Sequence, residues 1–270
     1  VEDGSSVPCK EVVDNYADRL DICYYFKSNS GPGQTRNYGA ERGHGEYLII
    51  LDSDCILPEG YLAAVESELQ QQKADAFGGP DRAHDSFTNI QKAINYAMTS
   101  FFTTGGIRGG KKKMDKFYPR SFNMGVRAEV YKALGGFSKM RFGEDIDFSI
   151  RIFQGGYACR LFPEAWVWHK RRTDLKKFFK QVHNSGIARI NLYKKYPKSL
   201  KVVHLLPALF TIGIVFLLLY SLVCSWSLSL LLLFALIICV DSTLRNKSFK
   251  IGLLSILASF IQLIGYGTGF

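Results

Sequence analysis

Acidic side chains gather at two places in this 270-residue sequence, and both could do metal or proton chemistry. Asp52 and Asp54 follow the apolar run Glu46–Leu51, which has the composition of a buried strand. Hard divalent cations such as Mg²⁺ and Mn²⁺ prefer oxygen ligands and usually bind through one or two carboxylates plus substrate phosphates. The pair therefore predicts a metal–diphosphate site, although aspartates are also common in ordinary turns after strands.

The second acidic group is Glu144, Asp145 and Asp147, at the start of a predicted helix. Acids in a first helical turn interact favourably with the helix dipole, so a structural role is one interpretation. The other is that one carboxylate is a general base that removes a proton from an attacking hydroxyl.

Three weaker signals accompany these acids. Asp3 follows the end of a strand and could contact a nucleotide base or ribose. The segment Gly33–Asn37 opens a helix and could present Arg36 and backbone N–H groups to phosphates. His169 follows the strand-like Ala165–Trp168 and could be a third metal ligand, although a lone histidine is more often structural.

These residues need a scaffold of alternating strands and helices over residues 1–170. We expect helices near 59–72 and 86–102 and a strand over Ala74–Gly79. The glycine- and lysine-rich segment 104–113 is either a solvated loop or a lid that meets phosphates or lipid headgroups. The alternation predicts an α/β fold with a mostly parallel sheet flanked by helices, which binds ligands beyond the carboxyl ends of its strands.

The ordered set of these motifs resembles the family 2 glycosyltransferases with the GT-A fold. The set comprises Asp3-Gly4-Ser5, Arg36-Asn37, Asp52 with Asp54, Asn123–Arg127, Gly135-Gly136-Phe137 and Glu144–Asp147. The resemblance covers about residues 1–170, and the family's first strand and helix would precede Val1. It implies transfer of a sugar with inversion from a nucleotide-sugar, usually UDP-linked, with Mg²⁺ or Mn²⁺.

The resemblance also implies roles for individual residues. Asp3 and Arg36 would contact the donor nucleotide, Asp52 the ribose or the metal, and Asp54 the metal. Asp145 would be the base, with Glu144 beside it. Family members with carboxyl-terminal membrane spans make exopolysaccharides or lipid-linked glycans. The processive synthases carry a Gln-x-x-Arg-Trp motif where this sequence has Gln181–Asn184, so single addition to a glycan or lipid-linked acceptor fits better.

The remaining sequence predicts membrane attachment. The formal net charge is +10, and residues 170–201 alone carry eleven Lys or Arg against the single acid Asp174. A basic block directly before an apolar block points to an anionic membrane surface rather than to nucleic acid. Within 171–201, residues 174–190 have the spacing of an amphipathic helix, either packed on the domain or lying in the membrane interface.

Residues 202–270 form the predicted transmembrane region. No charged side chain occurs from Leu205 to Val240, which is long enough for two spans, and Ile251–Gly267 is a marginal third. The basic segments place the catalytic region in the cytoplasm, at the cell inner membrane, with the turn near Ser225 outside. The six cysteines form no metal-binding or disulfide pattern and suit a cytosolic context. Two alternatives remain: a catalytically silent membrane scaffold, and a nucleotidyltransferase of similar architecture.

Overall fold

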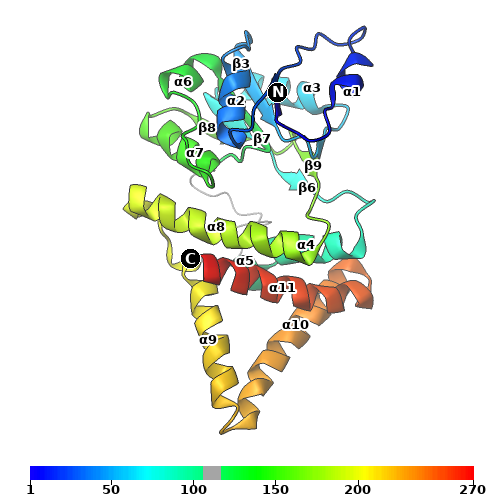
Figure 1. Cartoon of the computed structure of the whole chain (residues 1–270), viewed down its shortest axis with the longest axis vertical. Coiled ribbons are helices and arrows are strands. Elements are labelled where there is room, and N and C mark those ends of the chain that lie inside the picture. The colour runs from blue at the N-terminus through cyan, green and yellow to red at the C-terminus, as the bar shows by residue number, and fades with distance from the viewer. Residues whose placement is uncertain (106–116) are drawn as a thin grey trace. The chain divides into compact units, whose positions relative to one another are not determined.

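The computed structural model describes residues 1–105 and 117–270, which divide into two compact units (Figure 1). Unit 1 comprises residues 1–81 and 115–167, and unit 2 comprises residues 82–114 and 168–270. Residues 82–102, which the sequence analysis placed in the catalytic region, therefore group with the carboxyl-terminal helices. Most of the predicted loop 104–113 lies outside the described residues.

Unit 1 alternates strands and helices, as the sequence predicts. Its elements are β1 (Glu2–Asp3), α1 (Lys10–Asp14), β2 (Phe26–Lys27), α2 (Pro32–Ala40), β3 (Tyr47–Leu51), β4 (Cys55–Ile56), α3 (Tyr61–Gln71), β5 (Ala76–Gly78), β7 (Asn123–Arg127), α6 (Ala128–Ala133), α7 (Glu144–Gln154) and β8 (Cys159–Leu161). The boundaries between the units fall inside β6 (Asp81–Arg82) and β9 (Val167–His169), and β4, β9 and β6 form a three-stranded sheet in that order.

The larger sheet has the order β3-β7-β5-β8. β5 and β8 are parallel, but β7 lies antiparallel to both β3 and β5. The expectation of a mostly parallel sheet is therefore wrong for these four strands. The reason is the direction from which the chain enters β7. Asn123 starts the strand opposite Leu51, at the carboxyl end of β3, so β7 must run back toward the start of β3.

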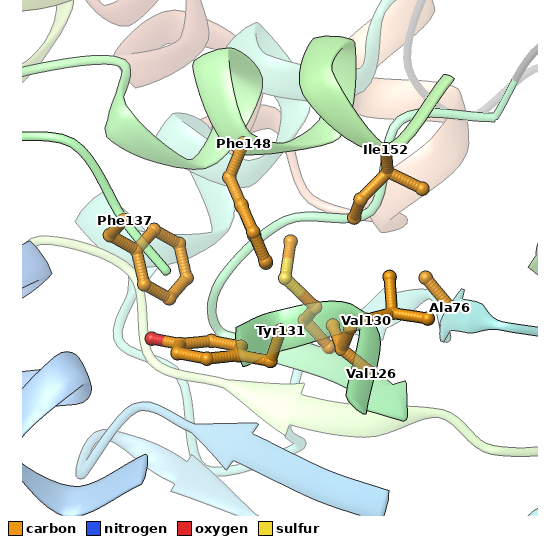
Figure 2. Packing of buried hydrophobic residues seen from close by; sticks show 8 residues of the cluster. Ala76, Val126, Val130, Tyr131, Phe137, Phe148 and Ile152 are labelled. Carbon is orange, nitrogen blue, oxygen red and sulfur yellow. The ribbon is translucent and has the colours of Figure 1, made fainter. Parts of the chain in front are cut away.

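A buried apolar cluster fixes α7 on this sheet (Figure 2). Phe148 and Ile152 are one turn apart on α7 and are fully buried. The Phe148 ring lies 5.2 Å from that of Tyr131 and 4.9 Å from that of Phe137, measured between centroids. The cluster also takes in Ala76, Met124, Val126 and Val130. Because this packing holds α7, it also holds the acidic first turn of the helix.

Unit 2 is mainly helical. Its helices are α4 (Asn89–Thr99), α5 (Phe101–Thr104), α8 (Leu175–Lys195), α9 (Leu206–Tyr220), α10 (Leu228–Asn246) and α11 (Phe249–Gly269). The helix expected over 86–102 is two helices. Ser100 has an extended backbone that ends α4, and its hydroxyl accepts a hydrogen bond from the Phe102 N–H of α5 at 3.3 Å.

The amphipathic helix predicted over 174–190 is α8. Asp174 caps it by accepting a hydrogen bond from the Lys177 N–H at 2.7 Å. Phe178 and Val182 are buried on one side, whereas Lys176 and Lys180 are exposed. The amphipathic pattern is thus confirmed, and its place in a membrane interface stays a prediction.

The apolar carboxyl-terminal region forms three helices of unequal length. Two of the described segments are long and apolar enough to cross a membrane, Ser225–Asn246 and Phe249–Gly269, whereas α9 has 15 residues. No residue of α9 is buried, and large apolar side chains along α9 and α10 are more than half exposed, Leu209, Phe216, Leu232 and Leu236 among them. Exposed apolar surface on this scale is typical of contact with lipid or protein.

Phe148→Ala should destabilise unit 1 strongly. Removing a fully buried ring leaves a cavity between α7 and the sheet and should lower the free energy of unfolding by about 3–5 kcal/mol. Denaturant titration followed by near-ultraviolet circular dichroism measures the change. Leu62→Ala, at a position on α3 that is 66% exposed, is the control and should differ little from wild type. Equal effects of the two substitutions would contradict the assigned core.

Candidate active site

The acid pair lies at the carboxyl end of β3, as predicted. Asp52 is the first residue after the strand, and its N–H donates to the Phe122 carbonyl at 3.4 Å. The chain then turns, with the Cys55 N–H donating to the Asp52 carbonyl at 3.0 Å. Asp52 and Asp54 are both half-buried in this turn. Two carboxylates so placed have the donor chemistry that a hard divalent cation prefers.

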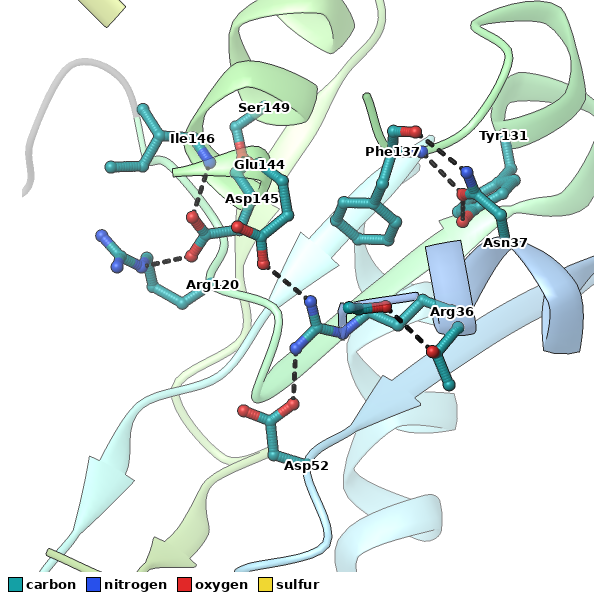
Figure 3. Close-up of polar contacts among 12 residues, drawn as sticks. Arg36, Asn37, Asp52, Arg120, Tyr131, Phe137, Glu144, Asp145, Ile146 and Ser149 are labelled. Atoms are coloured by element: carbon teal, nitrogen blue, oxygen red, sulfur yellow. Dashed lines mark hydrogen bonds and ion pairs between the residues drawn. The ribbon is translucent and has the colours of Figure 1, made fainter. Parts of the chain in front are cut away.

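Arg36 joins the two acidic groups that are far apart in the sequence (Figure 3). Its Nη2 donates to Asp52 Oδ1 at 2.8 Å and its Nη1 donates to Glu144 Oε1 at 2.9 Å. The guanidinium carbon lies 5.4 Å from the centre of the Phe137 ring. The Arg36 side chain is only 14% exposed, so both ion pairs are largely shielded from water. The predicted donor-binding residues Arg36 and Asp52 are therefore in direct contact.

A hydrogen-bonded clamp places α2 next to α7. The side chain of Asn37 donates to the Phe137 carbonyl at 2.9 Å and accepts from the Phe137 N–H at 2.8 Å. The Tyr131 hydroxyl donates to the same amide oxygen at 2.7 Å. Gly136 has φ +65° and lies so close that a Cβ there would be 2.4 Å from the Asn37 oxygen. The Arg-Asn and Gly-Gly-Phe motifs thus form one structural joint.

The pKa of Glu144 is raised by its surroundings. Burial, and next the negative charge of Asp145, raise its pKa above the ordinary value of 4.5, and the hydrogen bond and charge of Arg36 oppose this only in part. The Glu144 side chain is thus held in place by its hydrogen bond from Arg36.

Asp145 has a different partner. Its Oδ2 lies 2.7 Å from Arg120 Nε, and its Oδ1 accepts a hydrogen bond from the Ile146 N–H at 2.8 Å. Arg120 was not among the residues predicted for the site. It stands three residues before β7, and nothing in the local sequence distinguishes it from a surface arginine. Its role depends on the fold, which brings the start of β7 next to the start of α7.

Asp147 serves the structure instead. It is fully buried and paired with Arg151 Nε at 3.0 Å. Arg151 also donates to the carbonyls of Leu134 and Gly136, both at 2.7 Å. Asp147 therefore orients the arginine that holds the Gly-Gly-Phe loop, and the three acids of α7 have three different partners.

Asp3 organises the loop that leads into α2. Its Oδ1 accepts from Lys27 Nζ at 2.5 Å and from the Ser30 N–H at 2.9 Å, and its Oδ2 accepts from the Gly31 N–H at 2.9 Å. Burial opposes ionisation, but these hydrogen bonds outweigh it and lower the pKa of Asp3 to about 2. The nucleotide contact predicted for Asp3 stays a prediction.

A pocket of about 390 Å³ lies next to this loop. It is lined by the first turn of α2 with the residues before it, and by the segment that leads from the Gly-Gly-Phe loop toward α7, namely Asn29–Gln34 and Ser138–Arg141. Lys139 and Arg141 add positive charge beside a helix N-terminus, an arrangement that suits an anionic ligand. His169, the third predicted metal ligand, ends β9 in unit 2, and its role stays a prediction.

Comparison with known families decides the class of this protein. Residues 1–135, half of the chain, match the model of glycosyl transferase family 2. The chain belongs to glycosyltransferase family 2. Arg36, Asn37 and the two acids after β3 lie inside the matched residues, whereas α7 and its acids follow them.

Relatives and solved structures agree with this membership. The chain is 25% identical over 190 residues to the probable glycosyltransferase YdaM of Bacillus subtilis (strain 168), covering 67% of this chain but 44% of that protein. A shorter stretch of 71 residues, 26% of this chain and 8% of the other, is 34% identical to the minor teichoic acid biosynthesis protein GgaB of the same organism. The chain thus spans less than half the length of these two relatives.

The fold is also found in a solved glycosyltransferase. The mannosyltransferase PcManGT from Pyrobaculum calidifontis, in complex with GDP-Man and Mn²⁺, matches with a TM-score of 0.62 at 17% identity. The match covers 98% of this chain and 77% of that one. It confirms the expected GT-A-like α/β fold of this family 2 glycosyltransferase.

Glu144→Gln should change how the stability of this family 2 glycosyltransferase depends on pH. A raised pKa means that the folded state holds its proton longer than the unfolded chain does. The stability that Glu144 contributes is therefore present below pH 4.5 and is lost as the pH rises above it. Wild type should therefore lose unfolding free energy relative to Glu144→Gln as the pH rises above 4.5.

Urea titrations of both proteins at a series of pH values measure this difference. Glu59→Gln, at an exposed position before α3, controls for the loss of one negative charge. Parallel stability curves for wild type and Glu144→Gln would show that the Glu144 carboxylate is not perturbed in the folded protein.

Proposed function

We propose that this protein is a membrane-anchored, inverting glycosyltransferase that moves a sugar from a nucleotide-diphosphate donor to a glycan or lipid-linked acceptor. The observation that carries the proposal is the Arg36 bridge. It joins the acid pair after β3 to the acids of α7 at one place in the family's fold. The site thus combines groups suited to a diphosphate with groups suited to a hydroxyl.

The donor side comprises Asp3, Arg36 and Asp52. The Arg36 guanidinium, already shared between two carboxylates, can exchange one of them for a donor oxygen without leaving its place. Asp52 and Asp54, with His169 as the third candidate, would hold Mg²⁺ or Mn²⁺. When bound, such an ion would supply positive charge beside the departing diphosphate. The solved PcManGT complex contains GDP-Man and Mn²⁺, which supports a donor of this class, although we favour a UDP-linked sugar from the family resemblance.

The acceptor side comprises Asp145 and Glu144. The acceptor hydroxyl oxygen bonds to the anomeric carbon while the bond from that carbon to the donor phosphate oxygen breaks. The hydroxyl proton passes to the Asp145 carboxylate, and a nucleoside diphosphate leaves. We assign the base to Asp145 from its place in the family's Glu-Asp pair, and because Arg120 orients its carboxylate whereas Glu144 is already bonded to Arg36.

Unit 2 supplies the membrane anchor in this proposal. The α9–α10 hairpin is apolar and exposed, and residues 170–201 before it are basic. Arg245 stands in the last turn of α10, and Lys247 and Lys250 follow it. This charge pattern favours a multi-pass protein of the cell inner membrane with a cytoplasmic catalytic unit. α9 alone is about 22 Å long, so the turn residues Leu222 and Val223, both 84% exposed, would complete a crossing of about 30 Å.

An assay of the protein in membranes tests the function. A panel of nucleotide-sugars is supplied, and the release of nucleoside diphosphate is followed together with labelled sugar in the lipid and polysaccharide fractions. Exopolysaccharide or lipid-linked glycan synthesis is the expected context, and the similarity to a teichoic acid biosynthesis protein supports a cell-surface glycan. Release of pyrophosphate would indicate a nucleotidyltransferase, and no turnover despite donor binding would indicate a silent scaffold.

Asp54→Ala should abolish metal-dependent binding of the donor. A ligand carboxylate is lost, and the charge of the diphosphate stays uncompensated. Calorimetric titration with UDP, with and without Mn²⁺, measures the effect. Ser53→Ala, in the same turn but without a carboxylate, is the matched control and should bind as wild type does. Unchanged affinity of Asp54→Ala in the presence of Mn²⁺ would rule out the metal role.

Asp145→Asn should slow sugar transfer by about 10²–10⁴ with little change in donor affinity, because it keeps the shape and removes the basicity. Glu144→Gln should be milder. Asp147→Asn should mainly lower stability, since it breaks the buried pair with Arg151. Single-turnover transfer, donor titration and thermal unfolding of the three variants separate these effects. Near wild-type transfer by Asp145→Asn would move the base to Glu144.

A further inference from the structure

The last helix, α11, is packed lengthwise against α8 through glycines. A Cβ on Gly186 of α8 would lie 2.3 Å from the Tyr266 carbonyl oxygen. On α11, a Cβ on Gly265 would lie 2.5 Å from the Val182 side chain, and one on Gly269 would lie 2.0 Å from the His183 carbonyl oxygen. The two backbones therefore approach closely at these glycines, and the helices run alongside each other in Figure 1. Any tilt of α11 in a membrane is therefore shared by α8.

A single apolar cluster locks this pair to α4. It contains Ile94 and Ala97 of α4, Phe178 and Val182 of α8, and Ala258 of α11, all buried. α4, α8 and the first two-thirds of α11 thus form one helical layer with a common core.

The charges of α8 restrict how this layer can lie in a membrane. Lys176, Lys177 and Lys180 stand in its first two turns, Arg189 follows, and Lys194 and Lys195 end it. If α8 stood along the membrane normal, several of these side chains would enter the hydrocarbon, which is strongly unfavourable. An amphipathic helix with this charge distribution lies flat in the headgroup region.

The hairpin gives an independent restriction. Gly267 contacts Pro207 and Thr211 of α9, and Gly252 contacts Cys239 and Thr243 of α10. The two limbs therefore cross α11 at points about 22 Å apart along its axis and meet at the turn 221–224, as Figure 1 shows. Because the limbs start about 22 Å apart on α11 and meet at one turn, neither limb can run along α11, and each makes a steep angle with it. Helices arranged in this way cannot all stand along the membrane normal.

We propose that α11 does not cross the membrane but lies flat at the cytoplasmic lipid surface, beside α8 and across the open end of the α9–α10 hairpin. Its lipid-facing side is the exposed row Phe249, Leu253 and Leu257, spaced one turn apart. The partner is an anionic bilayer, which the lysines of α8 match in charge. This inference rests on the proposed membrane anchor and replaces the third span expected from the sequence.

The depth of single tryptophans in vesicles of phosphatidylethanolamine and phosphatidylglycerol tests the proposal. The three native tryptophans are replaced by Phe in the full chain, and Trp is placed at 249, 253 or 257. The control series is 232, 236, 240 and 244, exposed at the same spacing on α10. Quenching by lipids brominated at shallow or deep acyl positions reports the depth of each.

The α10 series should change depth steadily, whereas the three α11 positions should share one shallow depth. A spanning α11 would shift depth by about 12 Å between 249 and 257 and would overturn the proposal. Lack of quenching confined to α11 would also overturn it. Lack of quenching in both series would mean that unit 2 does not enter the membrane, and both the anchor and the flat α11 would then be wrong. The catalytic assignment would not be affected, because the sugar-transfer assay tests it separately.

Reporter fusions give a second measurement. Enzymes active only outside or only inside the cytoplasmic membrane are fused after Ser227, Asn246 or Phe270. We expect an external signal at Ser227 and cytoplasmic signals at both Asn246 and Phe270. An external signal at Phe270 would overturn the flat α11. A cytoplasmic signal at Ser227 would show a re-entrant hairpin and overturn the two crossings. The fusions at Asn246 and Phe270, which flank α11, would still show whether α11 crosses the membrane.

Discussion

The site depends on one buried cation that two carboxylates share. Arg36 bonds to Asp52, 16 positions away, and to Glu144, 108 positions away. Each carboxylate alone would be costly to bury, and so would the guanidinium, but together they satisfy one another in fixed directions. The fixed angle between the two Nη donors also sets where Glu144 lies, and hence where Asp145 lies at the next position of the helix. A lysine could supply the charge but not a rigid planar group that donates to two separate carboxylates at once.

The Arg36 bridge works only if α2 and α7 are already aligned, and neutral groups do that alignment. Asn37 bonds to both backbone groups of Phe137, and Phe137 packs against Phe148 in the core. Arg151, oriented by buried Asp147, secures the carbonyls on the other side of the same loop. Residues assigned no contact with the substrate thus link the acids of α7 to the packed core, and in this way they fix where the acids lie. This is why a cluster of three acids on one helical turn contains members with different tasks.

Local patterns predicted some of this molecule well. β3 with its two acids and the amphipathic α8 both follow from periodic apolar residues and their flanking residues, which are local properties. The antiparallel insertion of β7 could not be predicted from periodicity, because an apolar strand has the same composition in either direction. Arg120 was missed for a related reason: its partner Asp145 is distant in sequence, and no spacing links them. The grouping of α4 with the carboxyl-terminal helices likewise rests on contacts made by residues far along the chain.

The carboxyl-terminal region shows most clearly what amino-acid composition cannot predict, namely the orientation of an apolar helix. α10 and α11 pass the same test of length and hydropathy, yet their neighbours differ. Most of α10 packs loosely and leaves leucines exposed, whereas α11 buries Ser255 and Ser259 and approaches α8 through glycines. The Ser242 and Ser255 hydroxyls also bond to each other at 2.7 Å, which ties the end of α10 to α11. Hydropathy measures how well a helix tolerates lipid, but its orientation is set by what it is fastened to. A helix fastened along its length to a lysine-rich neighbour must lie where lysines can reach water.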